Sequence, residues 1–283
     1  MNKKEILENL EKYNFYHRIR LNDEIITPGI NRAQISKNLK LINEMDIKNK
    51  KVLDIGCRDG IYCFEAEKLG AKEVIGIDND ISEAAINFLI PYFKSKVKMY
   101  EKNLFDLTTE DFGKFDVIFF PGTLYHLRYP FFALKIVSDL LNEGGQLLIE
   151  TSILLEDKDR AMLFCPTGKE GPYGSTSCTF FNSKGLIDTL NSIGIKVISH
   201  KLSLKESFLK NFLKSILRIF KIKTLFGKNL TSVCRGLFYC KKDSSIINKN
   251  DHEYWNFSHK RHSIFQKESK SYKDFFKGRN EKK

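Results

Sequence analysis

Short apolar runs alternate with amphipathic stretches along the chain from Lys50 onward. Seven of these runs have the length and composition of buried strands. They lie at residues 51–55, 73–78, 96–101, 115–120, 146–151, 196–200 and 236–240. Because strands that alternate with helices along a chain pair into parallel sheets, the pattern predicts an α/β fold around one seven-stranded sheet.

The stretches between the predicted strands carry apolar residues at helical spacing, and several end in glycine, as a helix C-cap does. They cover residues 61–70, 80–93, 130–145 and 182–194. The first 48 residues predict a helical, aromatic-rich cap that joins the sheet through 25–34, where Pro28 and Gly29 indicate a turn. We therefore expect a cap over 1–48, a main domain over 49–243 and a basic, loosely ordered tail over 244–283.

An insertion over about 204–232 precedes the last predicted strand. Within 207–221, phenylalanine, leucine and isoleucine recur at helical spacing, while Lys210, Lys214 and Arg218 line the opposite face. This pattern predicts a basic amphipathic helix. Its role is a lid packed on the domain, a peripheral membrane contact or a contact to a phosphate backbone, and the pattern alone leaves the three open.

A chain of 283 residues is long enough for one well-buried core with appendages. It has no run of about 18 apolar residues, and its charged beginning lacks the apolar block of a signal peptide, so we expect a cytoplasmic protein. The six cysteines lie at 57, 63, 165, 178, 234 and 240, with no CxxC pair and no cluster with histidine at zinc spacing. Reduced thiols and no metal site are expected.

The formal net charge is +12 at pH 7, and residues 241–283 carry twelve Lys or Arg against six Asp or Glu. Half of the excess positive charge therefore lies in the tail. An acidic partner fits this charge, either a nucleic acid or a membrane surface. A lysine-rich composition can also reflect the amino-acid usage of a whole genome, with no such partner.

The stretch KVLDIGCRDG, residues 51–60, combines a strand end with a glycine loop. Gly56 and Gly60 allow a sharp turn into the following helix, whose N-terminus offers backbone N–H groups to a ligand. Asp54 precedes the first glycine, and Asp78 ends the second predicted strand, where a carboxylate can accept the two hydroxyls of a ribose. These positions together predict an adenosine-containing cofactor.

The residues inside the loop distinguish two such cofactors. A dinucleotide site calls for GxGxxG around its pyrophosphate, whereas Arg58 and Asp59 occupy the middle of this loop. An additional acid suits a ligand with an ammonium and a sulfonium better than one with two phosphates. The loop therefore favours S-adenosylmethionine over NAD.

Three segments, VLDIGCRDG, GIDND and FDVIFFPGTLYHL, resemble the successive cofactor motifs of class I S-adenosylmethionine-dependent methyltransferases. The resemblance covers about residues 49–240 and implies a Rossmann-like fold of seven strands with the last one antiparallel. It also implies a donor pocket. In that pocket Asp54, Gly56 and Gly60 hold the methionine end, Asp78 holds the ribose, Asn103, Leu104 or Asp106 holds the adenine, and Cys57 and Gly122 complete the lining.

The segment 122–151 closely resembles the same region of the CmoB-like tRNA methyltransferases, and 18–30, 178–196 and 235–242 extend the likeness in order. Those enzymes modify the 5-oxygen of the wobble uridine and use carboxy-S-adenosylmethionine. By this resemblance Tyr125 and Arg235 recognise the extra carboxylate of the donor. A guanidinium suits that role, because its fork geometry allows two charge-assisted bonds.

The chain departs from that family in two ways that leave the function open. The family's tRNA enzyme has a longer N-terminal segment with a lysine that also serves the donor carboxylate. Here Arg18 or Arg20 takes its place, or the donor is ordinary S-adenosylmethionine. The acceptor is then a tRNA, or a sugar, lipid-linked glycan or other small molecule, and a non-catalytic RNA-binding module is a third reading.

The loop after the fourth predicted strand carries the candidate catalytic residues, His126 and Tyr125. His126 either takes a proton from a hydroxyl or amine nucleophile or only orients the loop, since imidazole titrates near neutral pH. Tyr125 is expected to shape the donor pocket, because a phenol is poorly poised for proton transfer at pH 7. The glycine-rich stretch 165–178 is a flexible cover over the acceptor or a long surface loop.

Overall fold

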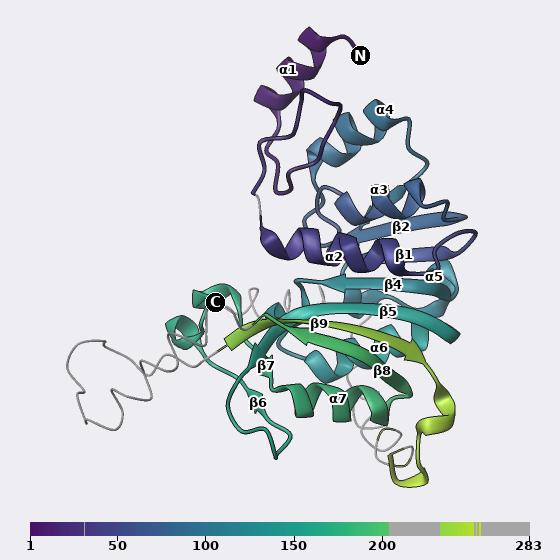
Figure 1. Ribbon diagram of the computed structural model, residues 1–283, viewed down its shortest axis with the longest axis vertical. Helices are drawn as coiled ribbons and strands as arrows, with labels where there is room; N and C mark the ends of the chain where they lie inside the picture. The colour runs from purple at the N-terminus through teal and green to yellow at the C-terminus, as the bar shows by residue number, and fades with distance from the viewer. Residues whose placement is uncertain (31, 204–232, 252, 254, 256–283) are drawn as a thin grey trace, which may run out of the picture.

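The computed structural model describes residues 1–30, 32–203, 233–251, 253 and 255 (Figure 1). Its centre is a seven-stranded sheet in the order β3-β2-β1-β4-β5-β9-β8. The strands are β1 (Lys51–Ile55), β2 (Glu73–Asp78), β3 (Lys98–Glu101), β4 (Phe115–Pro121), β5 (Leu141–Leu154), β8 (Ile195–Leu202) and β9 (Val233–Lys242). β9 alone runs antiparallel to its neighbours in this sheet. The predicted fold class, the seven strands and the antiparallel last strand are confirmed.

Helices cover both faces of the sheet, because side chains along each inner strand alternate between two hydrophobic clusters. Leu53 and Ile55 of β1 point into the cluster under α6 (Pro130–Leu140) and α7 (Ser183–Ser192). Val52 points into the opposite cluster, under α2 (Ala33–Glu44), α3 (Ile61–Lys68) and α4 (Ile90–Phe93). The result is a three-layer α/β sandwich.

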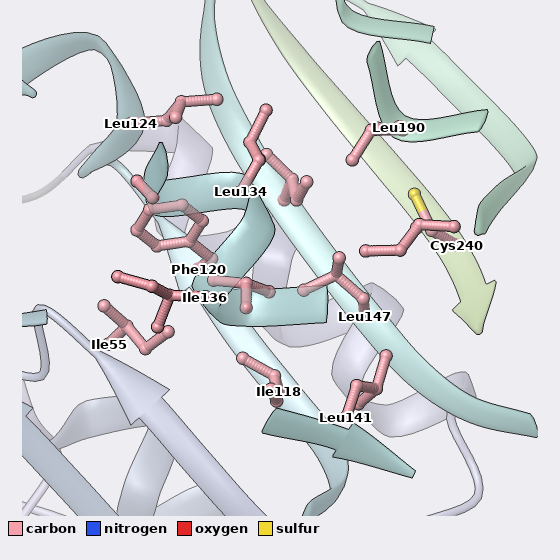
Figure 2. Close-up of a cluster of buried hydrophobic side chains, with 14 of the residues drawn as sticks. Ile55, Ile118, Phe120, Leu124, Leu134, Ile136, Leu141, Leu147, Leu190 and Cys240 are labelled. Carbon is pink, nitrogen blue, oxygen red and sulfur yellow. The ribbon is translucent and has the colours of Figure 1, made fainter. Parts of the chain in front are cut away.

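Figure 2 shows the first cluster. Leu134 and Ile136 of α6 pack over Ile118 and Phe120 of β4, and Leu147 of β5 closes the group. These side chains are almost completely buried. Each one contributes about 1.5 to 3 kcal/mol by leaving water, so this layer fixes the positions of the β4 and β5 ends.

Two predicted boundaries are wrong. α6 ends at Leu140 and β5 begins at Leu141, so the helix predicted over 130–145 is too long. Leu141 pairs with Phe115 of β4, and this tertiary pairing overrides the helical periodicity. β3 begins at Lys98 rather than at residue 96.

The N-terminal cap is only partly helical. Its helices are α1 (Lys3–Lys12) and α2, and residues 13–30 between them form an extended segment, here called the strap. The strap bridges to itself at His17↔Ile30, and a Cβ on Gly29 would lie 2.2 Å from the carbonyl oxygen of His17, so only glycine fits there. α1 and the strap lie at the α4 end of the molecule, where the Tyr92 hydroxyl donates to Leu21 O (Figure 1).

A small second sheet, which the sequence pattern did not predict, pairs β6 (Leu163–Phe164) with β7 (Phe180–Phe181). It frames residues 165–178, here called the cover loop. The N–H groups of Cys178 and Thr179 both donate to the carbonyl of Tyr125, at 2.9 and 3.3 Å. The cover loop is therefore attached to the loop that carries the two catalytic candidates.

The predicted insertion at 204–232 and most of the predicted tail lie outside the described residues. All six cysteines lie inside them as free thiols, four of them buried. In the described part of the chain, no helix is both long and apolar enough to cross a bilayer. The same part contains no group of three or more His, Cys, Asp or Glu side chains placed to hold a metal ion.

Candidate functional site

The carboxyl ends of β1 and β4 meet where the strand order reverses, which is where α/β sheets of this kind bind ligands. The glycine loop, residues 56–60, leaves β1 at this point. Gly56 has φ +80°, and a Cβ there would lie 2.3 Å from Thr123 Oγ1 of the loop after β4. Gly60 has φ +81° and opens α3. Both predicted glycines are required by the backbone and by close packing.

Asp54 is the buried acid of the site, with no exposed surface. The thiol of Cys63 donates to its Oδ2 at 3.3 Å, while its Oδ1 has no hydrogen-bond partner within the described ranges. Burial raises the pKa of Asp54 to about 7, against the opposing effect of the Cys63 thiol. A buried carboxylate oxygen without a partner is costly, so this oxygen is suited to a cationic ligand.

Asp78 ends β2 beside the loop and is held by two backbone N–H groups. The N–H of Arg58 donates to its Oδ2 and that of Asp80 to its Oδ1, both at 3.0 Å. Burial raises the pKa of Asp78 against these bonds. Each carboxylate oxygen keeps a further lone pair, so the side chain can accept the hydroxyls that the prediction assigns to it.

The predicted adenine-binding residues lie next to Asp78. The N–H of Lys102 donates to the carbonyl of Asp78 at 2.9 Å, which brings the following residues beside it. Asn103 caps the short 3-10 helix Leu104–Asp106 by accepting from the N–H of Phe105, and Leu104 is buried. These bonds hold the backbone of the segment beside the end of β2.

Cys57, a predicted donor contact, lies within the glycine loop. Its thiol is fully buried, and a Cβ on Gly76 would lie 2.8 Å from the sulfur. Its N–H donates to Ile77 O, and its carbonyl accepts from the N–H of Gly60. These two backbone bonds hold the turn of the glycine loop, and the role of Cys57 toward a donor stays a prediction.

Arg235, which is partly buried, and Glu150, which is buried, form an ion pair at the other end of the site. The Nε–H of Arg235 donates to Glu150 Oε1 at 2.5 Å, and its Nη2 donates to Oε2 at 2.6 Å. Glu150 is 2% exposed, and the guanidinium lies 4.6 Å from the ring centroid of Tyr125. The structure brings the two predicted carboxylate-binding residues together, but one edge of the guanidinium already holds a protein carboxylate.

Gly122 faces this ion pair. Its N–H donates to the carbonyl of Glu150 at 2.7 Å, and its φ is +70°. A Cβ there would lie 3.8 Å from Arg235 Nη2 and 3.9 Å from Glu150 Oε2. Because Gly122 has no side chain, it does not cover the side of the Arg235–Glu150 ion pair that faces it.

His126 stands at the rim of the site with part of its ring exposed. Its Nδ1 hydrogen-bonds the carbonyl of Thr176 in the cover loop, so Nδ1 carries the proton and Nε2 keeps its lone pair. The surrounding atoms lower the pKa of His126 by desolvation, and the charges of Arg235 and Arg32 lower it further, against the Thr176 bond. The imidazole is thus neutral at neutral pH and can accept a proton.

Asp59, which the loop pattern assigned to charge complementarity with a ligand, has a different role. Its Oδ2 accepts the backbone N–H groups of Tyr16 and His17, both at 2.6 Å, and the side chain is 1% exposed. Asp59 therefore anchors the strap to the glycine loop.

Four residues that lie in or next to the site were not predicted from the sequence. They are Thr123, Glu150, Tyr173 and Arg32. Tyr173 of the cover loop packs on the ring of Tyr125, at 5.5 Å between centroids, and its hydroxyl lies 3.2 Å from Ser152 Oγ. Of the two N-terminal arginines proposed to serve a donor carboxylate, Arg20 lies close to the carbonyl of Asp23 in its own turn. The charge of Arg32, another arginine of the N-terminal cap, acts together with that of Arg235 to lower the pKa of His126. Of the four, only Glu150 could have been found from the sequence, because it is an acid within the apolar run QLLIET.

Known proteins resemble this chain in sequence and in fold. A family model described as "Methyltransferase domain" matches residues 29–200. A tRNA U34 carboxymethyltransferase of Campylobacter hominis is 40% identical over 126 residues, covering 42% of this chain and 42% of that protein. The tRNA U34 carboxymethyltransferase of Helicobacter acinonychis is 35% identical over 127 residues, covering 44% and 48%. The match thus spans less than half the length of these curated relatives.

Solved structures resemble the chain over a larger part of its length. The N-terminal domain of EvdMO1, solved with SAH and D-fucose, superposes with a TM-score of 0.61 at 14% identity, covering 86% of this chain and 97% of that one. The 1,6-didemethyltoxoflavin-N1-methyltransferase of Burkholderia thailandensis superposes with a TM-score of 0.53 at 13% identity, covering 75% and 80%. At these identities the likeness concerns the fold alone.

Proposed function

The chain belongs to the family of methyltransferase domains, and we propose that it transfers a methyl or carboxymethyl group from an S-adenosylmethionine-type donor to the 5-oxygen of a tRNA wobble uridine. The resemblance to class I methyltransferases is confirmed by the family match. The tRNA acceptor rests on the names of the two curated relatives, which are tRNA U34 carboxymethyltransferases.

The observation that carries the donor assignment is the unpaired Oδ1 of Asp54 at the switch point of the sheet. A donor of this type has an ammonium at its amino-acid end, and the buried carboxylate of Asp54 supplies an acceptor for it. Asp78 accepts the ribose hydroxyls, and Asn103 and Leu104 border the adenine. The residues present therefore fit the donor. When bound, it supplies the transferred carbon on its sulfonium.

The ion pair of Arg235 and Glu150 bears on the choice between the two donors. Arg235 uses Nε and one Nη2 proton on Glu150 and also contacts the Tyr125 side chain through a hydrogen bond, so only part of the guanidinium remains for a donor carboxylate. This remaining part favours carboxy-S-adenosylmethionine. A second candidate keeps ordinary S-adenosylmethionine and a small acceptor such as a sugar or lipid-linked glycan, and the neutralisation of Arg235 by Glu150 favours it.

The protein needs few groups for the transfer itself, because in-line displacement depends mainly on alignment and on the exclusion of water. The cover loop packs Tyr173 on Tyr125 and shields this region. His126 accepts the proton of the attacking hydroxyl on Nε2, while its Nδ1–H stays on Thr176. Tyr125 shapes the pocket through its contact with Arg235.

The first experiment is mass spectrometry of small molecules that remain bound to the purified protein. We expect carboxy-S-adenosylmethionine, and subsequent incubation with tRNA lacking the modification should add a carboxymethyl group at the wobble uridine. Recovery of S-adenosylmethionine or S-adenosylhomocysteine alone would retain the methyltransferase and remove the carboxymethyl chemistry. Loss of transfer in His126→Asn, with donor binding intact, would support the proton acceptor, and full activity would refute it.

A further inference from the structure

A set of buried polar atoms without partners lies on the cap side of the site. Within the described ranges these atoms are Asp54 Oδ1, His17 Nδ1, Gln34 Nε2 and Asn38 Oδ1, besides Ser177 Oγ in the cover loop. A buried polar atom left without a hydrogen bond costs about 1 to 3 kcal/mol. Several such atoms in one region are a reason to look for a ligand that pairs with them.

Gln34 and Asn38 share one face of α2, because they are four residues apart in a helix. Asn38 is 2% exposed, and its Nδ2 donates to the hydroxyl of Tyr62 at 3.0 Å. Tyr62 lies in the first turn of α3, two residues after Gly60. This hydrogen bond docks the polar face of α2 on the helix that the glycine loop opens.

Asp54 lies close to the same point. Cys63, the residue after Tyr62 in α3, donates its thiol to Asp54 Oδ2 at 3.3 Å, and the charge of Asp54 adds to the rise in the pKa of Tyr62 that burial causes against the bond from Asn38. His17 also approaches, with its ring centroid 6.1 Å from that of Tyr62, but its Nδ1 lies 3.8 Å from Asp59 Oδ2 and is directed to the strap anchor. The unpaired atoms of Asn38, Gln34 and Asp54 are therefore the ones available to a ligand.

We propose that the α2 face formed by Gln34 and Asn38 closes over the amino-acid end of the donor. Asn38 Oδ1 joins Asp54 Oδ1 in accepting from the donor ammonium, and Gln34 Nε2 donates to the donor's α-carboxylate. A zwitterionic amino acid needs both acceptors and donors, and these three atoms supply both. The inference rests on the proposed function, since it requires a donor with an amino-acid end.

The test compares two ligands that differ only at that end. S-Adenosylhomocysteine carries the amino acid, whereas 5′-methylthioadenosine keeps the nucleoside and the sulfur without it. Calorimetric titration of Gln34→Met and Asn38→Leu should show binding of S-adenosylhomocysteine weakened about tenfold in each variant. Binding of 5′-methylthioadenosine should stay within about twofold of wild type, because neither residue reaches the nucleoside.

Asn43→Leu is the matched control on the same helix. Its Nδ2 bonds Glu65 of α3 and the carbonyl of Leu39 at the far end of α2, so neither affinity should change. Gln34→Met removes no hydrogen bond found in the described structure and keeps the test valid if Asn38→Leu does not fold. Equal losses for both ligands, or an unchanged affinity for S-adenosylhomocysteine, would overturn the inference. If the wild-type protein bound neither ligand, the proposed function itself would fail.

Discussion

Two buried carboxylates lie toward the carboxyl-terminal ends of inner strands of the sheet, and they differ in their bonding partners. Asp54 is the last residue but one of β1 and has no exposed surface, one thiol contact and one oxygen without a partner. Glu150 lies on β5 at 2% exposure with both oxygens bound to Arg235. The protein satisfies the second charge itself and leaves the first for a ligand.

This difference separates structure from binding within one pocket. Burial destabilises the charged form of Asp54, as its raised pKa indicates, and only a bound cation would offset this cost. At Glu150 the pair fixes the guanidinium in one orientation under Tyr125, at the expense of its net charge. The first end should therefore govern donor affinity, and the second should govern stability and donor choice.

The largest effect is expected from breaking the satisfied end. Glu150→Leu leaves the partly buried guanidinium of Arg235 without its carboxylate, which should lower the free energy of unfolding by at most about 3 to 5 kcal/mol. Urea denaturation measures this change. Asp139→Ala is the control, since it removes an exposed i,i+4 contact to Lys135 and should cost about 0.5 kcal/mol or less. A loss for Glu150→Leu as small as the control would show that the pair does not hold the β5 and β9 ends.

Removing the charge of Asp54, whose Oδ1 has no partner among the described residues, should instead raise the free energy of unfolding. Burial raises the folded-state pKa of Asp54 to about 7 from an ordinary value of 3.8, so its contribution to stability is present below pH 3.8 and lost as pH rises through 7. Asp54→Asn should therefore stabilise the ligand-free protein at pH 8, by at most roughly 4 kcal/mol, and much less at pH 5. Thermal denaturation at both pH values provides the measurement. A variant less stable than wild type at pH 8 would contradict an unpaired carboxylate.

Donor binding should depend on the same titration of Asp54, but here the deprotonated form is the favourable one. Between pH 5.5 and 7.5 an α-ammonium remains mostly charged, while Asp54 must lose its proton to accept from it. The affinity for S-adenosylhomocysteine should thus rise roughly 25-fold over this range, with proton release visible by calorimetry in two buffers. Asp54→Asn should bind more weakly, with little dependence on pH from this source. An equally steep profile in the variant would assign the titration to another group.

The glycine loop and the strand ends were predictable because their signals are local. Asp54, Gly56 and Asp78 stand at fixed positions relative to apolar runs, and the parallel sheet then brings their ends together. The boundary between α6 and β5 was not predictable, since it depends on the pairing of Leu141 with Phe115 rather than on periodicity.

The partners of the buried acids were beyond reach for a similar reason. Glu150 and Arg235 are 85 residues apart, and only the antiparallel pairing of β5 with β9 makes them meet. Asp59 binds backbone N–H groups about 40 residues upstream, and a backbone donor leaves no mark in a sequence. The sequence pattern thus located the acids and could not say which were already satisfied.

The smallest effect concerns donor choice at the satisfied end. Glu150→Gln keeps the shape and one acceptor for Arg235 but restores its net positive charge beside Tyr125. The affinity ratio of carboxy-S-adenosylmethionine to S-adenosylmethionine should then rise about fivefold, because an added charge near a partly exposed partner gives about 1 kcal/mol. Competition binding measures the ratio, and Glu150→Gln combined with Arg235→Gln should return it to the wild-type value or below. A ratio unchanged by Glu150→Gln would mean that the guanidinium does not face the donor's extra carboxylate, and that Arg235 serves only to join β9 to β5.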